Sequence, residues 1–193
     1  MDNTQERLLQ IAAKLFADKG YAGVSMRAIA NAAGITQAAI YHHFANKEAL
    51  YFAAVRHLHE DISAELTSGL STSAPAEERF ALLVAQMLSR LDAEEDFRHI
   101  YFRELLEGDQ HRLRELVTNV FSGVSTLIEH LLEELAPAQD SHLLLLSLTW
   151  LVVHHLEARK LSALLPGGKP EHTELPVLAN HITTLLLHGV QKQ

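Results

Sequence analysis

The stretch GITQAAIYHHF, residues 34–44, decides the fold of the first part of this chain. It contains a glycine, two alanines and several uncharged polar side chains, and it has no acidic residue, lysine or arginine. A helical pattern beginning after Ser25 precedes it, and Thr36 can cap a second, very short helix. Gly34 can adopt a positive φ in the turn between them without steric cost. Helix, glycine-containing turn and short helix together are the sequence form of a helix-turn-helix.

The short helix has two chemically different sides. Ile40 and Phe44 have the spacing of inward-facing residues, while small Ala30 and Ala33 on the preceding helix allow the two helices to cross closely. The outer side is then expected to carry Gln37, Ala38, Tyr41 and His42.

These outward groups suit contact with a DNA duplex. Gln37 can bond adenine through N6 and N7, and the methyl groups of Thr36 or Ala38 can meet a thymine methyl. Tyr41 and His42 have polar tips suited to phosphate oxygens. The pattern therefore predicts a helix that reads the major groove.

Phosphate contacts are predicted on both sides of this helix. Lys47 falls in the first turn of the next helix, where a positive side chain and free amide hydrogens form an anion site. Ser25 and Arg27 occupy the same kind of place at the start of the preceding helix. A three-helix portion of an ordinary bundle is the alternative interpretation of the same pattern.

Helical spacing continues along the chain, and no convincing period-two strand or internal repeat is found, so we predict an all-α fold. The first helix ends at Gly20, and a long fourth helix runs from a cap at Asn46 to about Leu70. A fifth helix starts near Pro75. Further helices are expected at about 93–107, 109–135 and 139–165, with Gly108 and Asp109 separating the first two, and a last helix follows the LPGGKP loop. We expect a helix-turn-helix domain at residues 1–46 and a larger helical bundle at residues 47–193.

The N-terminal quarter resembles the TetR family of transcriptional regulators. The resemblance is continuous and depends on a combination of residues rather than on one: Leu9, Ala12, Leu15, Phe16, Gly20, Tyr21, Ser25, Ile29, Ala30, Ala33, Gly34, Ile40, Tyr41, Phe44, Lys47, Glu48 and Leu50. It implies a homodimer whose two reading helices enter successive major grooves of an operator that is expected to be palindromic. It also implies a C-terminal domain that binds a small inducer. Many members have lysine, arginine or glycine where this chain has Gln37, Ala38 and Ala39, so we expect little direct guanine readout there.

The last helix offers a self-complementary surface. Following the resemblance, we expect the dimer interface to include Leu178, Ile182, Leu185 and Gly189. An apolar stripe of this kind is also what plain core packing produces.

Candidate effector residues are polar or aromatic side chains embedded in apolar helices. His99, Phe102 and Arg103 share a helix face, as do Trp150 and His154, with Arg159 close by. Such a cavity would be apolar with a few polar anchors. We therefore expect a lipophilic effector, with an anionic end for Arg103 or Arg159, although core packing explains each residue as well.

Composition limits the remaining classes. The net charge is −8, but residues 1–50 carry five Lys/Arg against four acids, so the acidity lies in the remainder. There is no cysteine, which excludes disulfides and thiolate chemistry. The N-terminus has no signal-peptide pattern, and the most apolar run, residues 141–156, is shorter than the roughly 20 residues of a membrane span. We expect a soluble, cytoplasmic protein that contacts no membrane.

Two rival functions are alternatives to a ligand-responsive regulator. Thirteen histidines suggest a metal- or histidine-linked sensor, but no two have the i, i+3 or i, i+4 spacing of helical metal ligands. An enzyme built on a helical bundle is the other class, and the sequence has no Gly-x-Ser-x-Gly, H-E-x-x-H or phosphate-binding glycine loop. We therefore predict no catalytic residue, no metal site and no cofactor.

Overall fold

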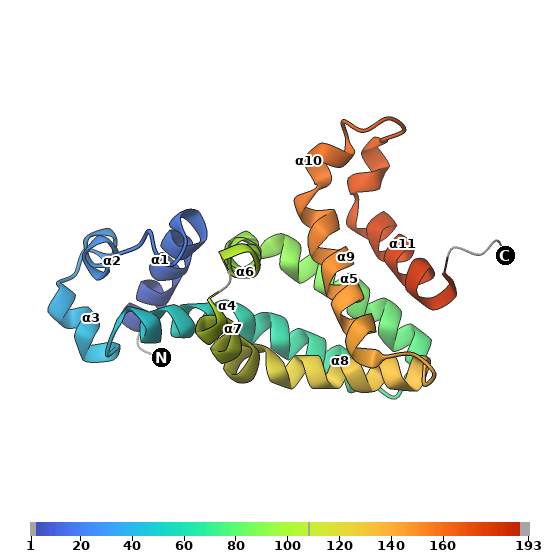
Figure 1. Cartoon of the computed structure of the whole chain (residues 1–193), viewed down its shortest axis with the longest axis horizontal. Coiled ribbons are helices and arrows are strands. Elements are labelled where there is room, and N and C mark those ends of the chain that lie inside the picture. The colour runs from blue at the N-terminus through green and yellow to red at the C-terminus, as the bar shows by residue number, and fades with distance from the viewer. Residues whose placement is uncertain (1–2, 108, 190–193) are drawn as a thin grey trace. The chain divides into compact units, whose positions relative to one another are not determined.

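The structure, a computed structural model, describes residues 3–107 and 109–189, and this part of the chain is helical with no strand (Figure 1). The predicted break at Gly108 lies outside the described residues. The elements are α1 (Asn3–Lys19), α2 (Met26–Ala33), α3 (Gln37–His43), α4 (Lys47–Leu70), α5 (Ala76–Ala93), α6 (Glu95–Glu107), α7 (Gln110–Leu116), the π-helical turn η1 (Val117–Phe121), α8 (Ser122–Leu135), α9 (Ser141–Glu157), α10 (Arg159–Ser162), the 3-10 turn η2 (Pro170–Thr173) and α11 (Leu175–His188).

Backbone contacts divide the chain into two compact units. Unit 1 contains residues 1–61 and 94–122, and unit 2 contains residues 62–93 and 123–193. Helix α4 therefore contributes to both. The units divide the chain differently from the expected boundary at residue 46, because α6 and α7 belong to the same unit as the first three helices. The division into a DNA-binding part and a ligand-binding part remains a functional prediction.

Unit 1 is built on the apolar stripe of α1. Leu8, Ala12 and Phe16 are at most 2% exposed, and α1 packs against both α2 and α6. The helix ends as predicted at Gly20, whose φ is +70° and whose amide donates to the Phe16 carbonyl at 2.8 Å. Helix α1 therefore contacts both α6 and α2, the first helix of the helix-turn-helix.

In unit 2, α5 packs against α9 and α11, which also contact each other (Figure 1). Leu178 and Ile182 of α11 are 5% and 0% exposed within the single chain, so these two side chains form part of its core. They are therefore not available to a symmetry mate as the sequence predicted. Leu185 is half-buried, and Gly189 is exposed just after the helix, with φ +69°.

Two long helices expected from the sequence are interrupted. The segment expected as one helix at 109–135 contains the π-helical turn η1 between α7 and α8. The helix expected at 139–165 ends at Glu157, where Ala158 leaves helical geometry with φ −84° and ψ 3°. No helix among residues 3–107 and 109–189 combines the length and apolarity needed to cross a membrane.

Candidate nucleic-acid interface and effector region

The turn before α3 is fixed by backbone and cap geometry. Gly34 has φ +70°, and its amide bonds the carbonyls of Ala30 and Asn31, while the Ile35 amide donates to Ala30 at 3.0 Å. The Thr36 hydroxyl then accepts from the Ala39 amide at 3.2 Å and starts α3. The cap and the left-handed glycine are thus where the sequence placed them.

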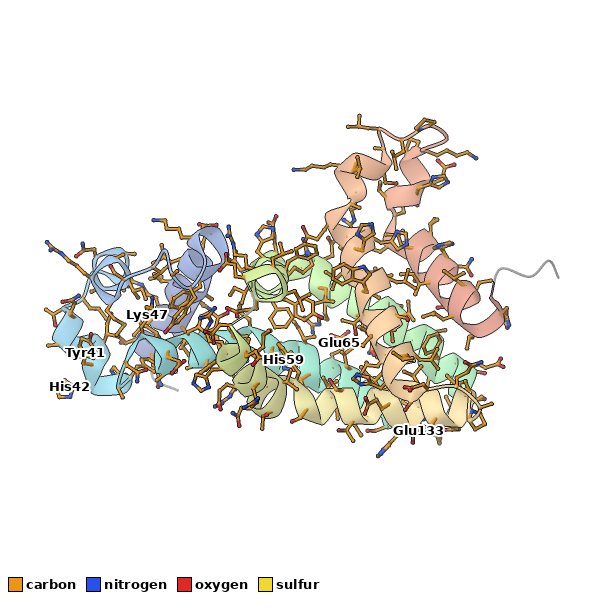
Figure 2. All side chains as sticks on the ribbon, viewed as in Figure 1. Tyr41, His42, Lys47, His59, Glu65 and Glu133 are labelled. Carbon is orange, nitrogen blue, oxygen red and sulfur yellow. The ribbon has the colours of Figure 1, made fainter. Side chains whose placement is uncertain are left out.

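Helix α3 presents the side expected from its sequence. Ile40 and Phe44 are 0% and 7% exposed and hold the helix from beneath. Its outward residues are all exposed, Tyr41 by 51%, and in Figure 2 Tyr41 and His42 point away from the ribbon. The exposed residues of this face are Thr36, Gln37, Ala38, Tyr41 and His42.

The start of α2 also has the predicted form. The Ser25 hydroxyl accepts from the Ala28 amide at 3.2 Å, and Ser25 itself is exposed. Arg27, in the first turn, is exposed as well. This end of α2 therefore leaves a cation next to free amide donors, the arrangement that suits a phosphate group.

Lys47 differs from the prediction. Its ammonium donates to the carbonyls of Tyr21 at 2.9 Å and Val24 at 3.1 Å, and it lies 4.0 Å from the centre of the Tyr21 ring. Burial, and then the nearby charge of Arg112, lower the pKa of Lys47. Its side chain thus anchors the loop between α1 and α2 to α4 instead of extending toward a phosphate.

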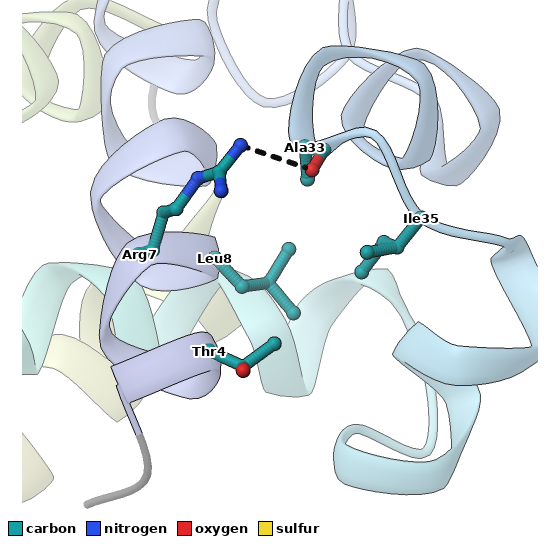
Figure 3. Close-up of a pocket in the computed structure, with 5 residues that line it drawn as sticks. All are labelled: Thr4, Arg7, Leu8, Ala33 and Ile35. Atoms are coloured by element: carbon teal, nitrogen blue, oxygen red, sulfur yellow. Dashed lines mark hydrogen bonds between the residues drawn. The ribbon is translucent and has the colours of Figure 1, made fainter.

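A shallow pocket of about 300 Å³ lies between α1 and the turn after α2 (Figure 3). It is lined by Thr4, Arg7, Leu8, Ala33 and Ile35. Arg7 donates to the Ala33 carbonyl at 3.5 Å, at the C-terminal end of α2. A cation is favourable at this end of a helix dipole, so Arg7 helps to hold the turn that orients α3.

A group of side chains, which we call the Tyr21 clamp, connects the loop before α2 and the start of α4 to α6 and α7. It consists of Tyr21, Lys47, Tyr51, Glu104 and Arg112. The Glu104 side chain is nearly fully buried, accepts from the Tyr51 hydroxyl at 2.7 Å and from Arg112 Nε at 3.1 Å, and the Arg112 guanidinium lies 4.5 Å from the Tyr21 ring. Burial, followed by the hydrogen bond to Glu104, raises the pKa of Tyr51 well above its usual range. Removing one partner from such a buried ion pair commonly costs about 3–5 kcal/mol.

The first three predicted effector residues lie on α6 in unit 1. His99 is half-buried, with Nε2 3.7 Å from the Glu95 carboxylate, and Phe102 is half-buried on the same helix. Arg103 donates to the carbonyls of Ala17 and Asp18 at 3.0 Å each, at the end of α1. Arg103 therefore ties α6 to α1, which leaves less of its guanidinium for a ligand.

The other three lie in unit 2. Trp150 is 48% exposed on α9, and His154 is exposed on the same helix. Arg159 pairs with Asp92 at 3.0 Å, while its Nε and Nη2 atoms are buried and have no hydrogen-bond partner among the described residues. Of the six predicted residues, Arg159 alone has buried donor atoms without a hydrogen-bond partner among the described residues.

A buried group of rings in unit 1 was not predicted. This aromatic cluster consists of His59, Phe97, Tyr101 and Phe121. The His59 ring lies 5.6 Å from Phe97 and 5.3 Å from Phe121, and Tyr101 lies 6.2 Å from Phe121. His59, labelled in Figure 2, is 7% exposed, and burial lowers its pKa to about 4, so the ring is neutral at physiological pH. The sequence did contain one indication that His59 is buried. It continues the three- and four-residue spacing of the apolar, buried residues Tyr51, Val55 and Ile62 of α4.

No group of three or more His, Asp or Glu side chains within residues 3–107 and 109–189 is arranged to hold a metal ion. Three histidine rings do approach one another in unit 2, where His155 lies 6.4 Å from His154 and 5.6 Å from His181.

The capped α2, the Gly34 turn and the exposed side of α3 define a helix-turn-helix of the DNA-binding class. Residues 8–54 match the sequence model for bacterial regulatory proteins of the tetR family. In this N-terminal part the chain is therefore similar to the tetR family of regulators.

Similar proteins extend the comparison beyond the N-terminal part. The HTH-type transcriptional repressor KstR2 of Rhodococcus jostii (strain RHA1) is 34% identical over 116 residues, which are 58% of this chain and 51% of KstR2. The matching part thus spans about half of that relative. The nucleoid occlusion factor SlmA of Shewanella baltica (strain OS185) is 20% identical over 132 residues, 68% of this chain and 67% of SlmA. The crystal structure of the transcriptional regulator FadR from Bacillus subtilis in complex with stearoyl-CoA superposes with a TM-score of 0.77 at 18% identity, covering 96% of this chain and 98% of FadR.

Proposed function

We propose that this protein is a homodimeric, ligand-responsive DNA-binding regulator of transcription, acting as a repressor that a small lipophilic effector releases from its operator. The observation that carries the proposal is the exposed, uncharged side of α3, held in a fixed orientation by the Gly34 turn and by buried Ile40 and Phe44. A helix that only packed within a bundle would not need this arrangement. The role is regulatory rather than catalytic, and its place is the bacterial cytoplasm, where the chromosome lies.

Base readout in this proposal comes from α3. Gln37 bonds an adenine edge, and the methyl groups of Thr36 and Ala38 contact thymine. Tyr41 and His42 reach phosphate oxygens, and Ser25 and Arg27 at the start of α2 supply a further phosphate contact. Lys47 contributes by fixing the loop between α1 and α2, because its ammonium is bonded there.

Dimerisation in this proposal uses the exposed side of α9 together with α11. Leu143, Leu146 and Trp150 are 59%, 51% and 48% exposed and follow each other at three- and four-residue spacing. A continuous apolar stripe of this kind on one helix suits an isologous contact with a second copy. Leu185 of α11 and Gly189 just after it remain available to the same contact, whereas Leu178 and Ile182 support it from the core.

An anionic group on the effector is supported by a local observation within unit 2. The buried, unpaired nitrogens of Arg159 lack an acceptor among the described residues, and an unsatisfied buried donor is costly. FadR, which shares the fold, is described in complex with stearoyl-CoA, a molecule with a long apolar chain and several phosphates.

DNA binding is tested by selection. Purified protein is incubated with sheared genomic DNA of the source bacterium, and retained fragments are sequenced at two salt concentrations. We expect a shared palindromic motif and a steep loss of retention with salt. If the retained DNA fragments share no motif, the protein has no specific operator and that part of the proposal is wrong.

The effector class is tested by thermal shift with stearoyl-CoA, stearate and the neutral primary alcohol of the same chain length. We expect the two anions to raise the melting temperature more than the alcohol, and Arg159→Gln to reduce that difference. Equal shifts from all three compounds would contradict the anionic end.

A further inference from the structure

The segment that joins α7 to α8 has an unusual backbone. In η1 the Ser122 amide bonds the Val117 carbonyl, five residues earlier, so this turn holds one residue more than an α-helical turn. Such π turns are rare and are found mainly at functional sites. No side chain of η1 is buried, and Val117 is 57% exposed. Within η1, only the carboxyl end is packed, through the half-buried Val120 and Phe121, while Val117, Thr118 and Asn119 are exposed.

The carboxyl end of η1 lies in the aromatic cluster. Phe121, its last residue, is 5.3 Å from His59, 6.1 Å from Phe97 and 6.2 Å from Tyr101, measured between ring centres. Phe121 is only half-buried, unlike His59 and Phe97. Phe121, like Tyr101, is therefore a member of the cluster that a bound molecule would displace at lower cost than His59 or Phe97.

The amino end of the same segment lies in the Tyr21 clamp. Arg112 of α7 bonds both carboxylate oxygens of Glu104, at 3.1 and 3.3 Å, and stacks on Tyr21. The Lys47 ammonium donates to the carbonyl of Tyr21 and also to that of Val24. Val24 directly precedes Ser25, the cap of α2. One continuous segment, residues 112–121, therefore connects the aromatic cluster to the start of the helix-turn-helix.

We infer that η1 is a register switch between effector and reading head. The inference rests on the proposed function and states how effector binding would change the helix-turn-helix. Displacement of Phe121 frees the extra residue of η1, which moves toward α7 and shifts that helix by one residue, about 1.5 Å and 100°. Arg112 then leaves Glu104 and Tyr21, and the loop from Tyr21 to Ser25 loosens. Both registers use the same backbone groups, so the segment has the two discrete arrangements that a switch requires.

The test uses no DNA and no effector, so its outcome is independent of whether the proposed function holds. Hydrogen exchange is followed in the full chain for the amides of residues 21–25. Phe121→Ala, which removes the ring that holds the register, is expected to raise exchange there five- to tenfold. Deletion of Asn119, an exposed residue of η1, converts the turn to an α-helical one with both flanking helices in phase. In that background Phe121→Ala is expected to change exchange less than twofold.

Two further variants keep the test decisive. Asn119→Ala retains five residues in η1. With and without Phe121→Ala, its exchange at residues 21–25 is expected to match that of the chain with Asn119. Arg112→Gln cuts the connection at its other end, so adding Phe121→Ala to it is expected to have less than a twofold further effect. The inference is overturned if Phe121→Ala has no effect on residues 21–25. It is equally overturned if its effect is the same with Asn119 deleted or with Arg112 replaced.

Discussion

At the scale of single residues, a buried histidine makes stability depend on pH. The pKa of His59 falls to about 4 in the folded protein, against about 6.5 in an unfolded chain. The unfolded state therefore binds more protons between these two values, and stability falls as pH decreases through this window. Above pH 6.5 the contribution is constant.

Replacing His59 by phenylalanine keeps a ring in the aromatic cluster and removes the titration. We expect the loss of unfolding free energy between pH 6.5 and 4 to be smaller in His59→Phe than in the unmodified chain by roughly 3 kcal/mol. Urea unfolding at a series of pH values measures this difference. His57→Phe, two residues away on α4 and half-buried, retains the His59 ring and is the matched control, so the pH dependence that His59 causes should remain.

Two cations near the reading helix should behave differently. Arg27 is exposed at the start of α2, so Arg27→Ala should reduce the salt dependence of duplex binding by about one ion per subunit. The Lys47 ammonium is bonded to Tyr21 and Val24, so Lys47→Met should lower stability by about 1–3 kcal/mol and leave that slope nearly unchanged. Fluorescence anisotropy against salt, with urea unfolding in parallel, measures both. A flattened slope in Lys47→Met would show that its side chain reaches phosphate.

At the scale of elements, the Gly34 turn determines how α3 is presented. Its φ of +70° is unfavourable for a residue with a Cβ, although the surrounding space is open. Gly34→Ala should therefore cost about 1–2 kcal/mol of unfolding free energy. Gly123→Ala, in the first turn of α8 with equally open space and no positive φ, should instead stabilise by about 0.5–1 kcal/mol. Equal effects at the two positions would contradict the role of backbone geometry.

Caps and turns were predictable from the sequence because their signals are local. Ser25, Thr36 and Asn46 each accept an amide hydrogen bond from three residues later, as their position before an apolar pattern indicated. The π turn and the break after Glu157 were not predictable, since apolar spacing looks the same on both sides of each. An extra residue in a turn is decided by tertiary contacts such as those of Phe121.

At the scale of the whole molecule, the exposed stripe of α9 predicts how two copies associate. Leu146→Asp places a charge in the middle of the stripe and should convert a dimer to a monomer in sedimentation velocity at micromolar concentration. Leu106→Asp, on α6 and 75% exposed, lies outside the stripe and should leave the oligomeric state unchanged. Dissociation by both variants, or by neither, would place the interface elsewhere.

The long-range parts of the candidate site were beyond the reach of sequence. The outer side of α3 could be read from helical period alone, because burial of Ile40 and Phe44 fixes the opposite side. The inward bonds of Lys47 depend on residues more than twenty positions away, as do the contacts of Glu104 with Tyr51 and of Arg103 with α1. A single sequence shows that a charged residue falls on the apolar face of a helix, but it does not show which distant residue that charge will contact.

The claim that α3 reads DNA is tested most directly by Gln37→Ala in the genomic selection. We expect the unmodified protein to recover a palindromic motif with an A·T pair at one position in each half-site. The variant should lose preference at that position by about 1–3 kcal/mol and keep the rest of the motif. If both proteins recover the same motif with the same preference at every position, Gln37 does not contact a base and the assignment of α3 as the reading helix is contradicted.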